Sequence, residues 1–215
     1  HRALAREAAR KSFVLLKNEG VLPLAPDTKT AYIGPYVDSR NLMGAWSLTG
    51  ETKDVATLRE AVLEQRADAD AVFCCGCPMT DRDMKLEGFL ECMDEMVSAE
   101  EQQRMMDEAV EAAKACGRVV MLLGEDRRQS GEAASSAGIQ IPGIQQELLD
   151  RVCAVCDQVA VVLFSGRPLD IRRIAEKAQA VLLAWMPGTE GARALVDVLS
   201  GRYAPSGKLP MSFPY

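Results

Sequence analysis

The chain has 215 residues, enough for one large domain or two small ones, and its 48% hydrophobic and 26% charged residues are ordinary for a globular protein. The net charge of −6 leaves no basic surplus to neutralise phosphate, so we expect no nucleic-acid partner and no anionic membrane partner. No segment approaches the roughly 18 consecutive apolar residues that a membrane span needs.

In chain order, apolar runs alternate with helical patterns. The first 17 residues predict a helix, with Leu15 and Leu16 on its apolar stripe, that ends before Gly20 and Pro23. The remaining helices are expected at 55–65, 101–116, 144–155, 170–177 and 192–199. The strands are expected at 30–33, 71–75, 119–123, 159–164 and 180–185, and Phe213 begins either a sixth strand or a linker. Residues 78–100 are acidic, rich in methionine and weakly periodic, which indicates an excursion between a strand and a helix.

Continuous apolar strands that alternate with helices indicate a parallel sheet covered on both faces. We therefore predict an α/β fold, a three-layer sandwich with a mostly parallel five- to six-stranded sheet, as a single domain over residues 1–215. The loops that follow the strands are expected to gather at one edge of the sheet, where open α/β sheets bind ligands. These loops comprise residues 44–47, 124–136, 165–168 and 185–191.

Histidine and cysteine usage narrows the chemistry. The chain begins at His1 rather than Met, so we expect a fragment of a longer protein. His1 is the only histidine, which excludes a Ser-His-Asp site or a histidine zinc site within the chain. The seven cysteines are irregularly spaced, which favours reduced thiols and a cytoplasmic location. We read Cys74–Cys77 as a buried strand end and Cys153–Cys156 as part of a helix, and expect neither a metal nor a cofactor.

The loop after the predicted strand 119–123 carries the strongest functional signal. It contains Glu125 and Glu132 but no cysteine or histidine, so it favours general acid–base chemistry over acyl transfer. Either glutamate is a candidate acid, and the competing interpretation is a solvated carboxylate or an ion pair with Arg127 or Arg128. No phosphate-binding glycine motif is present, and Glu132 places a negative charge where a phosphate would need the opposite.

Three further side chains are candidates for contact with a ligand. Trp46 and Trp185 follow strands, where an aromatic ring either stacks on a sugar or packs against the end of the sheet. Arg167 either grips a ligand or pairs with Asp170 or Glu190.

Several of these segments together resemble the C-terminal α/β sandwich domain of glycoside hydrolase family 3, with the β-glucosidases as the nearest match. The resemblance begins at Ala8–Leu24 and runs nearly to the end of the chain. Its other segments are Ile33–Pro35, Met43–Ser47, Gly131–Ser135, Gly166–Leu169, Trp185–Gly191 and Pro205–Pro214.

The resemblance implies a retaining glycosidase, acting on a β-linked glucoside or oligosaccharide, whose active site lies between two domains. A preceding TIM-like barrel of the same parent protein would supply the aspartate nucleophile and most sugar contacts, and this domain the acid/base carboxylate. Glu132 matches that position best, and Glu125 is the fallback. Trp46, Arg167 and Trp185 would then line the cleft or the domain interface. The isolated chain is expected to be inactive, and an oligomer is possible.

One departure from the family pattern concerns the residues after Glu132. Relatives commonly carry Arg near Ser136 and Asp near Gly138, and both are missing here. We therefore expect the missing Arg and Asp to affect which sugar this loop accepts. The alternative function is a non-catalytic α/β scaffold or a flavodoxin-like binding module.

Overall fold

The structure, a computed structural model, describes residues 1–47, 51–65, 70–81, 97–132, 134 and 137–214. Within this part of the chain, six strands form one sheet in the order β1-β6-β5-β4-β2-β3. Their bounds are Val14–Asn18 (β1), Thr30–Ile33 (β2), Ala71–Cys74 (β3), Val119–Gly124 (β4), Val159–Phe164 (β5) and Ala180–Leu183 (β6). Every neighbouring pair is parallel except β1 with β6. The predicted α/β class and mostly parallel sheet are therefore confirmed.

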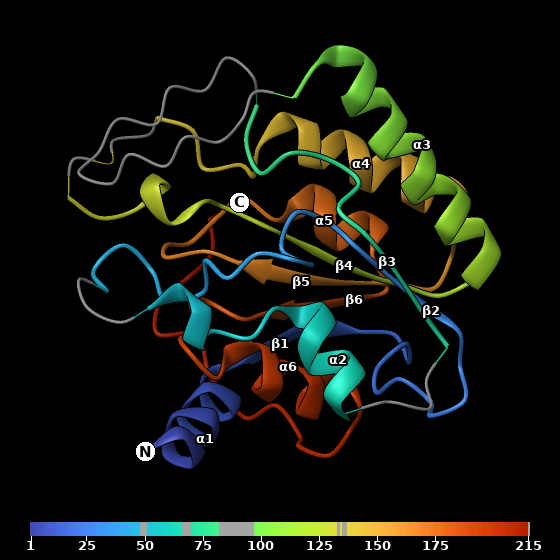
Figure 1. The fold of residues 1–215 in the computed structure, drawn as a ribbon. Helices are drawn as coiled ribbons and strands as arrows, with labels where there is room; N and C mark the ends of the chain where they lie inside the picture. The colour runs from blue at the N-terminus through green and yellow to red at the C-terminus, as the bar shows by residue number, and fades with distance from the viewer. Residues whose placement is uncertain (48–50, 66–69, 82–96, 133, 135–136, 215) are drawn as a thin grey trace.

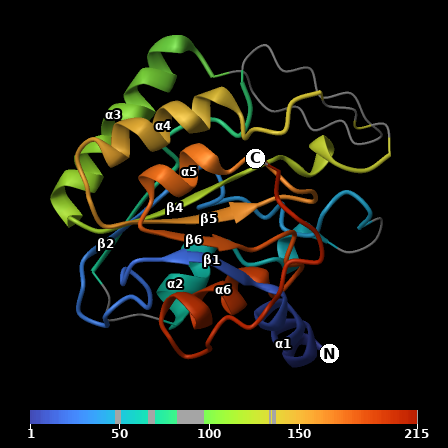
Figure 2. The same ribbon diagram turned by 180° about the vertical axis from the view of Figure 1, so that it is seen from behind.

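Helices cover both faces of the sheet, as Figures 1 and 2 show from opposite sides. On one face lie α1 (Arg2–Ser12), α2 (Leu58–Gln65) and α6 (Gly191–Leu199), and on the other lie α3 (Ala99–Cys116), α4 (Gly143–Cys153) and α5 (Arg172–Lys177). Successive residues of each strand point to opposite faces. Val120 and Val162 thus belong to the core under α6, whereas Met121 and Val161 belong to the core under α4.

The N-terminal prediction is wrong in part. The helix α1 ends at Ser12, and Val14–Asn18 forms the edge strand β1, which pairs antiparallel with β6. Leu15 and Leu16 have helical spacing, but a free edge on β6 offers them backbone hydrogen bonds, and tertiary pairing overrides local pattern. The sixth strand is therefore at the N-terminal end, and Phe213 lies in an irregular segment.

α1 packs against α6 through a buried carboxylate. Asp197 of α6 is 4% exposed and accepts two hydrogen bonds of 2.7 Å from the Arg6 guanidinium. Arg10 and Arg202 approach the same carboxylate at 3.5 and 3.7 Å. A buried carboxylate needs nearby positive charge to remain ionised. Three guanidinium groups supply that charge to Asp197.

The other elements follow the predicted order with shifted ends. Ser98 caps α3 by accepting a hydrogen bond from Glu101 N, and the buried face of the helix carries Met106, Ala109 and Ala113. α2 begins at Leu58, three residues later than expected. Of the excursion at 78–100, residues 82–96 lie outside the described chain.

Candidate active site

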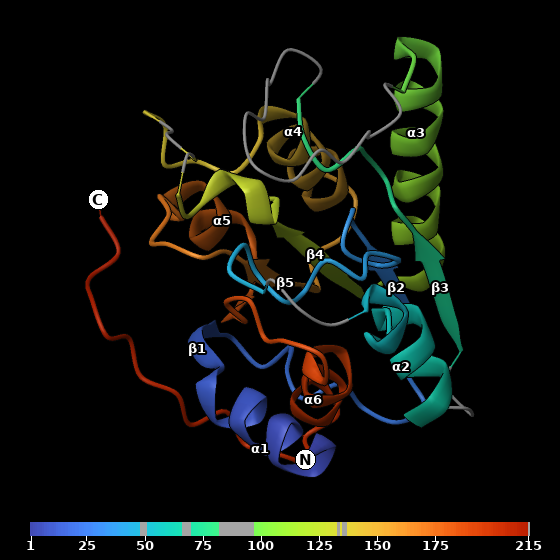
Figure 3. The same ribbon diagram turned by 60° about the vertical axis from the view of Figure 1, so that its left-hand side comes forward.

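The loops after the parallel strands meet at one edge of the sheet, which faces the viewer in Figure 3. Gly188 N donates to Leu42 O at 2.8 Å, joining the loops after β6 and β2. A Cβ built on Gly166 would lie 2.3 Å from Ser130 Oγ, so the loops after β5 and β4 touch with no room for a side chain. The predicted gathering of strand-end loops is therefore present.

Glu125 leaves β4 in a direction fixed by Gly124. The backbone of Gly124 has a φ of +153°, and a Cβ there would lie 1.9 Å from Phe164 O. Only glycine fits this close approach of β4 to β5. Glu125 N then donates to Phe164 O at 2.9 Å, and its side chain is fully buried.

The Glu125 carboxylate is occupied by groups from the loop after β5. Arg167 Nε lies 3.1 Å from both carboxylate oxygens and Arg167 Nη2 lies 2.6 Å from Oε1, while Ser165 Oγ donates to Oε2 at 3.1 Å. Hydrogen bonding to Glu125 raises the pKa of Arg167 against the opposing effect of burial. Arg167 therefore pairs with neither Asp170 nor Glu190. Asp170 pairs with Arg172, and Glu190 pairs with Arg2 and Arg193.

The backbone of Glu125 is held from the opposite side by Tyr36. Its hydroxyl donates to Glu125 O, and its ring stacks on Phe164 with centroids 4.2 Å apart. Burial, together with the charges of Asp126 and Glu125, raises the pKa of Tyr36 far above its usual value. The phenol is therefore a neutral donor at any physiological pH.

A short turn, η2 (Arg127–Gln129), follows Glu125 and is closed by a reciprocal pair of side-chain hydrogen bonds. Asp126 accepts from Arg128 N at 2.9 Å, and Gln129 Oε1 accepts from Asp126 N at 2.8 Å. Arg128 Nε also forms an ion pair with Asp126 at 2.7 Å. An ion pair of a loop arginine was expected, but with Glu125 or Glu132 as the acid. This reciprocal cap fixes the path of the chain toward Gly131.

Glu132 differs from Glu125 because its side chain is exposed. It follows Gly131, whose φ of +110° turns the chain, and a Cβ added to that glycine would meet Ala45 Cβ and Trp46 Nε1 at 3.3 Å. Trp46 is 65% exposed. The residue that precedes Glu132 therefore lies against Trp46, and both Glu132 and Trp46 are exposed.

Trp185 packs on the C-terminal segment. Its ring is tilted 56° against Phe213 at a centroid distance of 6.1 Å. Its φ of 56° is a left-handed conformation that bulky residues rarely adopt. Such backbone strain is often retained at ligand sites, and the binding role of Trp185 stays a prediction.

The structure thus brings Glu125 to Arg167 and Gly131, the residue before Glu132, to Trp46, while the ring of Trp185 contacts Phe213. Sequence reasoning missed Ser165 and Tyr36, both of which hold Glu125. The signal that could have found Ser165 is its place directly after a strand, opposite the loop after the neighbouring strand.

A buried glutamine supports the same edge. Gln145 of α4 accepts from Gly124 N and donates to Gly124 O, both at 2.8 Å, and also donates to Met79 O at 2.6 Å. Asp81 accepts from Gly143 N and Ile144 N at 2.8 and 2.7 Å, which caps α4 from the loop after β3. α4 is thereby fixed to the end of β4.

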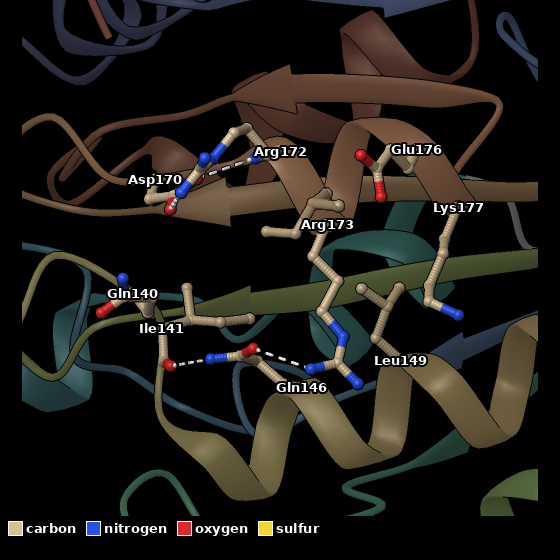
Figure 4. A pocket seen from close by; sticks show the side chains of 10 residues that line it. Gln140, Ile141, Gln146, Leu149, Asp170, Arg172, Arg173, Glu176 and Lys177 are labelled. Carbon is tan, nitrogen blue, oxygen red and sulfur yellow. Dashed lines mark hydrogen bonds and ion pairs between the residues drawn. The ribbon is translucent and has the colours of Figure 1, made fainter. Parts of the chain in front are cut away.

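A cavity of about 440 Å³ lies between α4 and α5 (Figure 4). Its cations face carboxylates: Arg172 pairs with Asp170, and Arg173 and Lys177 both pair with Asp150. These three cations are therefore compensated within the chain.

Metal and thiol chemistry have little support in the residues that the structure describes. No group of three or more His, Cys, Asp or Glu side chains is placed there to hold a metal ion. The six cysteines in this part are free, and burial raises the pKa of Cys74 to about 12 and of Cys153 to about 11. Such thiols are poor nucleophiles and poor metal ligands near neutral pH.

Comparison with known families decides the assignment. The model of the glycosyl hydrolase family 3 C-terminal domain matches residues 13–215. The chain belongs to this family. The family 3 domain is 40% identical over 219 residues to a protein described as a periplasmic β-glucosidase from Salmonella typhimurium, covering 100% of this chain and 28% of that protein. It is 31% identical to a β-xylosidase from Formosa agariphila, covering 100% of this chain and 28% of that protein.

Solved structures agree. A β-glucosidase from Listeria innocua in complex with glucose superposes with a TM-score of 0.82 at 35% identity, over 99% of this family 3 domain and 27% of that chain. A complex of the same enzyme with isofagomine gives the same values. The domain thus spans about 28% of the length of the Salmonella and Formosa relatives.

None of the helices in the described ranges combines the length and apolar character needed to cross a bilayer.

Proposed function

We propose that this family 3 domain supplies Glu132 as the acid/base carboxylate of a retaining β-glycosidase of the β-glucosidase type. The observation that carries the proposal is the contrast between the two candidate carboxylates. Glu132 is exposed and follows Gly131, which lies against the exposed indole of Trp46, whereas Glu125 is fully buried and paired with Arg167. A general acid must reach the oxygen that it protonates, and Glu132 has the accessible position.

The proposed reaction uses two carboxylates about 5–5.5 Å apart. One attacks the anomeric carbon and forms a glycosyl-enzyme intermediate, while Glu132 protonates the departing oxygen. Glu132 then removes a proton from the water that releases the sugar. We assign the nucleophile and most sugar contacts to an N-terminal TIM-like barrel of the same parent protein, as the family resemblance implies.

Trp46, Trp185 and Arg167 differ in how well their surroundings suit contact with a sugar. Trp46 offers an exposed ring beside Gly131, suited to the apolar face of a sugar. Trp185 is half-buried against Phe213, so we assign it to the cleft wall. Arg167 is engaged by Glu125, which favours a role in holding the protein itself.

The test compares the full-length parent protein with its Glu132→Ala variant on aryl β-glucosides of poor and good leaving groups. General acid catalysis contributes about 10²–10⁴-fold, so we expect a loss of that order in kcat/KM for poor leaving groups and a much smaller one for good leaving groups. Because Glu132 also deprotonates water, kcat for the good leaving groups should fall as release of the sugar becomes slow. Azide should restore turnover of the good substrates and yield a glycosyl azide. Glu111→Ala removes an exposed carboxylate of α3 and is the matched control, expected to behave as wild type.

Wild-type rates for Glu132→Ala would contradict the proposal. The acid/base would then be Glu125 or a residue of another domain, and in the second case this domain would be a scaffold. The family match already disfavours the flavodoxin-like alternative.

The isolated chain of 215 residues should not hydrolyse aryl β-glucosides, because we place the nucleophile outside it. Turnover above background by the purified chain, retained after a second chromatographic step, would show that the site is complete without a barrel.

The cytoplasmic location is retained as a proposal that rests on the free cysteines. The Salmonella relative is described as periplasmic, which favours the other compartment. Fractionation of the source cells, followed by immunoblotting for the parent protein, distinguishes the two.

A further inference from the structure

The ion pair of buried Glu125 with half-buried Arg167 lies in the loops that flank Glu132. We infer that this pair, a single ion pair between two strand-end loops, is the positioning device that sets Glu132 for proton transfer. The inference rests on the proposed acid/base role of Glu132. It assigns Glu125 and Arg167 as positioning residues, since their side chains are engaged with each other.

The loop after β5 meets the chain on both sides of Glu132. Before it, Gly166 lies flush against Ser130, whose Oγ would be 2.3 Å from any added Cβ. After it, Arg167 Nη2 donates to Gly138 O at 2.8 Å, and Asp170 N donates to Ile139 O at 2.8 Å. The chain that bears Glu132 is therefore held at Ser130 and again at Gly138.

The Arg167 guanidinium makes both the contact with Glu125 and the contact with Gly138. Arg167 Nη2 lies 2.6 Å from Glu125 Oε1 and 2.8 Å from Gly138 O, while its Nε faces both carboxylate oxygens at 3.1 Å. Glu125 is in turn held in place, because its backbone is bonded to Phe164 and Tyr36. The pair thus transmits the fixed position of β4 to Gly138.

The chemistry of arginine suits this task and that of lysine does not. A guanidinium presents several N–H donors in one rigid plane and binds a carboxylate and a carbonyl at once. A lysine ammonium keeps the charge but not the fork geometry, so Arg167→Lys should keep charge compensation and loosen the contact at Gly138. Geometric errors of about 1 Å at a catalytic group cost up to about 100-fold in rate.

The test uses the full-length parent protein and four variants: Arg167→Lys, Glu125→Gln, Glu132→Ala and the double variant Glu132→Ala/Arg167→Lys. For phenyl β-glucoside, a poor leaving group, we expect Arg167→Lys and Glu125→Gln to lower kcat by about 10- to 100-fold with little change in KM. For 2,4-dinitrophenyl β-glucoside, which needs little acid assistance, both should lose less than about threefold in glycosylation rate.

The double variant provides the decisive comparison. If Arg167 acts through Glu132, then Arg167→Lys should change the rate by less than about twofold once Glu132 is alanine. An equal loss in both backgrounds would overturn the inference, because Arg167 would then act on the sugar or on the fold. A loss equal for all leaving groups, with a lowered Tm, would overturn it in the same way.

The matched control is Arg172→Lys. Arg172 lies just beyond the same strand-end loop, but its side chain is 58% exposed and pairs with Asp170, as Figure 4 shows. It should match wild type on both substrates.

Azide separates this inference from the proposed function. A glycosyl azide from Glu132→Ala together with additive losses retains the acid/base and rejects the positioning pair. A glycosyl azide from Glu125→Gln, and none from Glu132→Ala, would make Glu125 itself the acid/base and reject both.

Discussion

The connection from β4 to α4 has two halves that contrast in almost every physical respect. Residues 125–129 are mostly buried, and their polar groups are bonded to the loop after β5, to Tyr36 and to one another. Gly131 and Glu132 are exposed, and the neighbours described around Gly131 are Ala45 and Trp46. Two glutamates seven positions apart in the chain thus occupy opposite environments.

The contrast shows how one loop separates structural work from chemistry. A desolvated carboxylate needs a partner to remain charged, and Glu125 has one in Arg167. A group that exchanges protons with substrate needs access, which Glu132 has. Burial therefore assigns different roles to two residues that look alike in sequence.

The largest expected effect comes from the glycines that begin each half. Gly124→Ala drives a Cβ into Phe164 O and should destabilise the domain by more than about 4 kcal/mol, whereas Gly131→Ala meets Ala45 and Trp46 at 3.3 Å and should cost about 1–2 kcal/mol. Thermal denaturation of the parent protein measures both. Equal shifts in Tm would show that the two halves are equally constrained.

A smaller effect is expected when the buried half loses its cation. Arg167→Met leaves Glu125 buried without a counter-charge and should cost about 3 kcal/mol, seen as a drop of several degrees in Tm. Arg172→Met removes an exposed partner and should change stability by less than about 1 kcal/mol. If the two variants melt together, the Glu125 pair is solvated in the native protein.

The smallest effect is expected from removal of the Tyr36 hydroxyl, which donates to the Glu125 carbonyl. Tyr36→Phe leaves a buried carbonyl without its donor and should cost about 1–2 kcal/mol. Tyr203→Phe, whose hydroxyl lies 3.5 Å from Ser206 at an exposed site, is the control and should be neutral within about 0.5 kcal/mol. A neutral Tyr36→Phe would mean that water replaces the phenol.

Most of the sheet is predictable from sequence because its inner strands are continuous apolar runs. Val159–Phe164 and Thr30–Ile33 have the predicted bounds, since a strand buried on both faces leaves little ambiguity. β1 could not be predicted in this way. Its residues have helical spacing, and its partner β6 lies more than 160 residues along the chain.

The candidate site also has one part that the sequence predicts and one part that it does not. The loop and both glutamates are visible in the sequence, because a carboxylate-rich loop follows a buried strand. The pairing of Glu125 with Arg167 is not visible, because it depends on the register of β4 with β5 across 42 residues. Local pattern carries no information on such a contact, whereas it does place both loops at one edge.

The contact of α1 with α6 sets the practical boundary of this domain. The family match begins at residue 13, after α1 has ended. A fragment cut there would lose Arg6 and Arg10 and, of the three arginines described around Asp197, keep Arg202 at 3.7 Å. We therefore expect the folding unit to begin before the segment that the family model matches, and a truncation meant to isolate this domain should include Arg2.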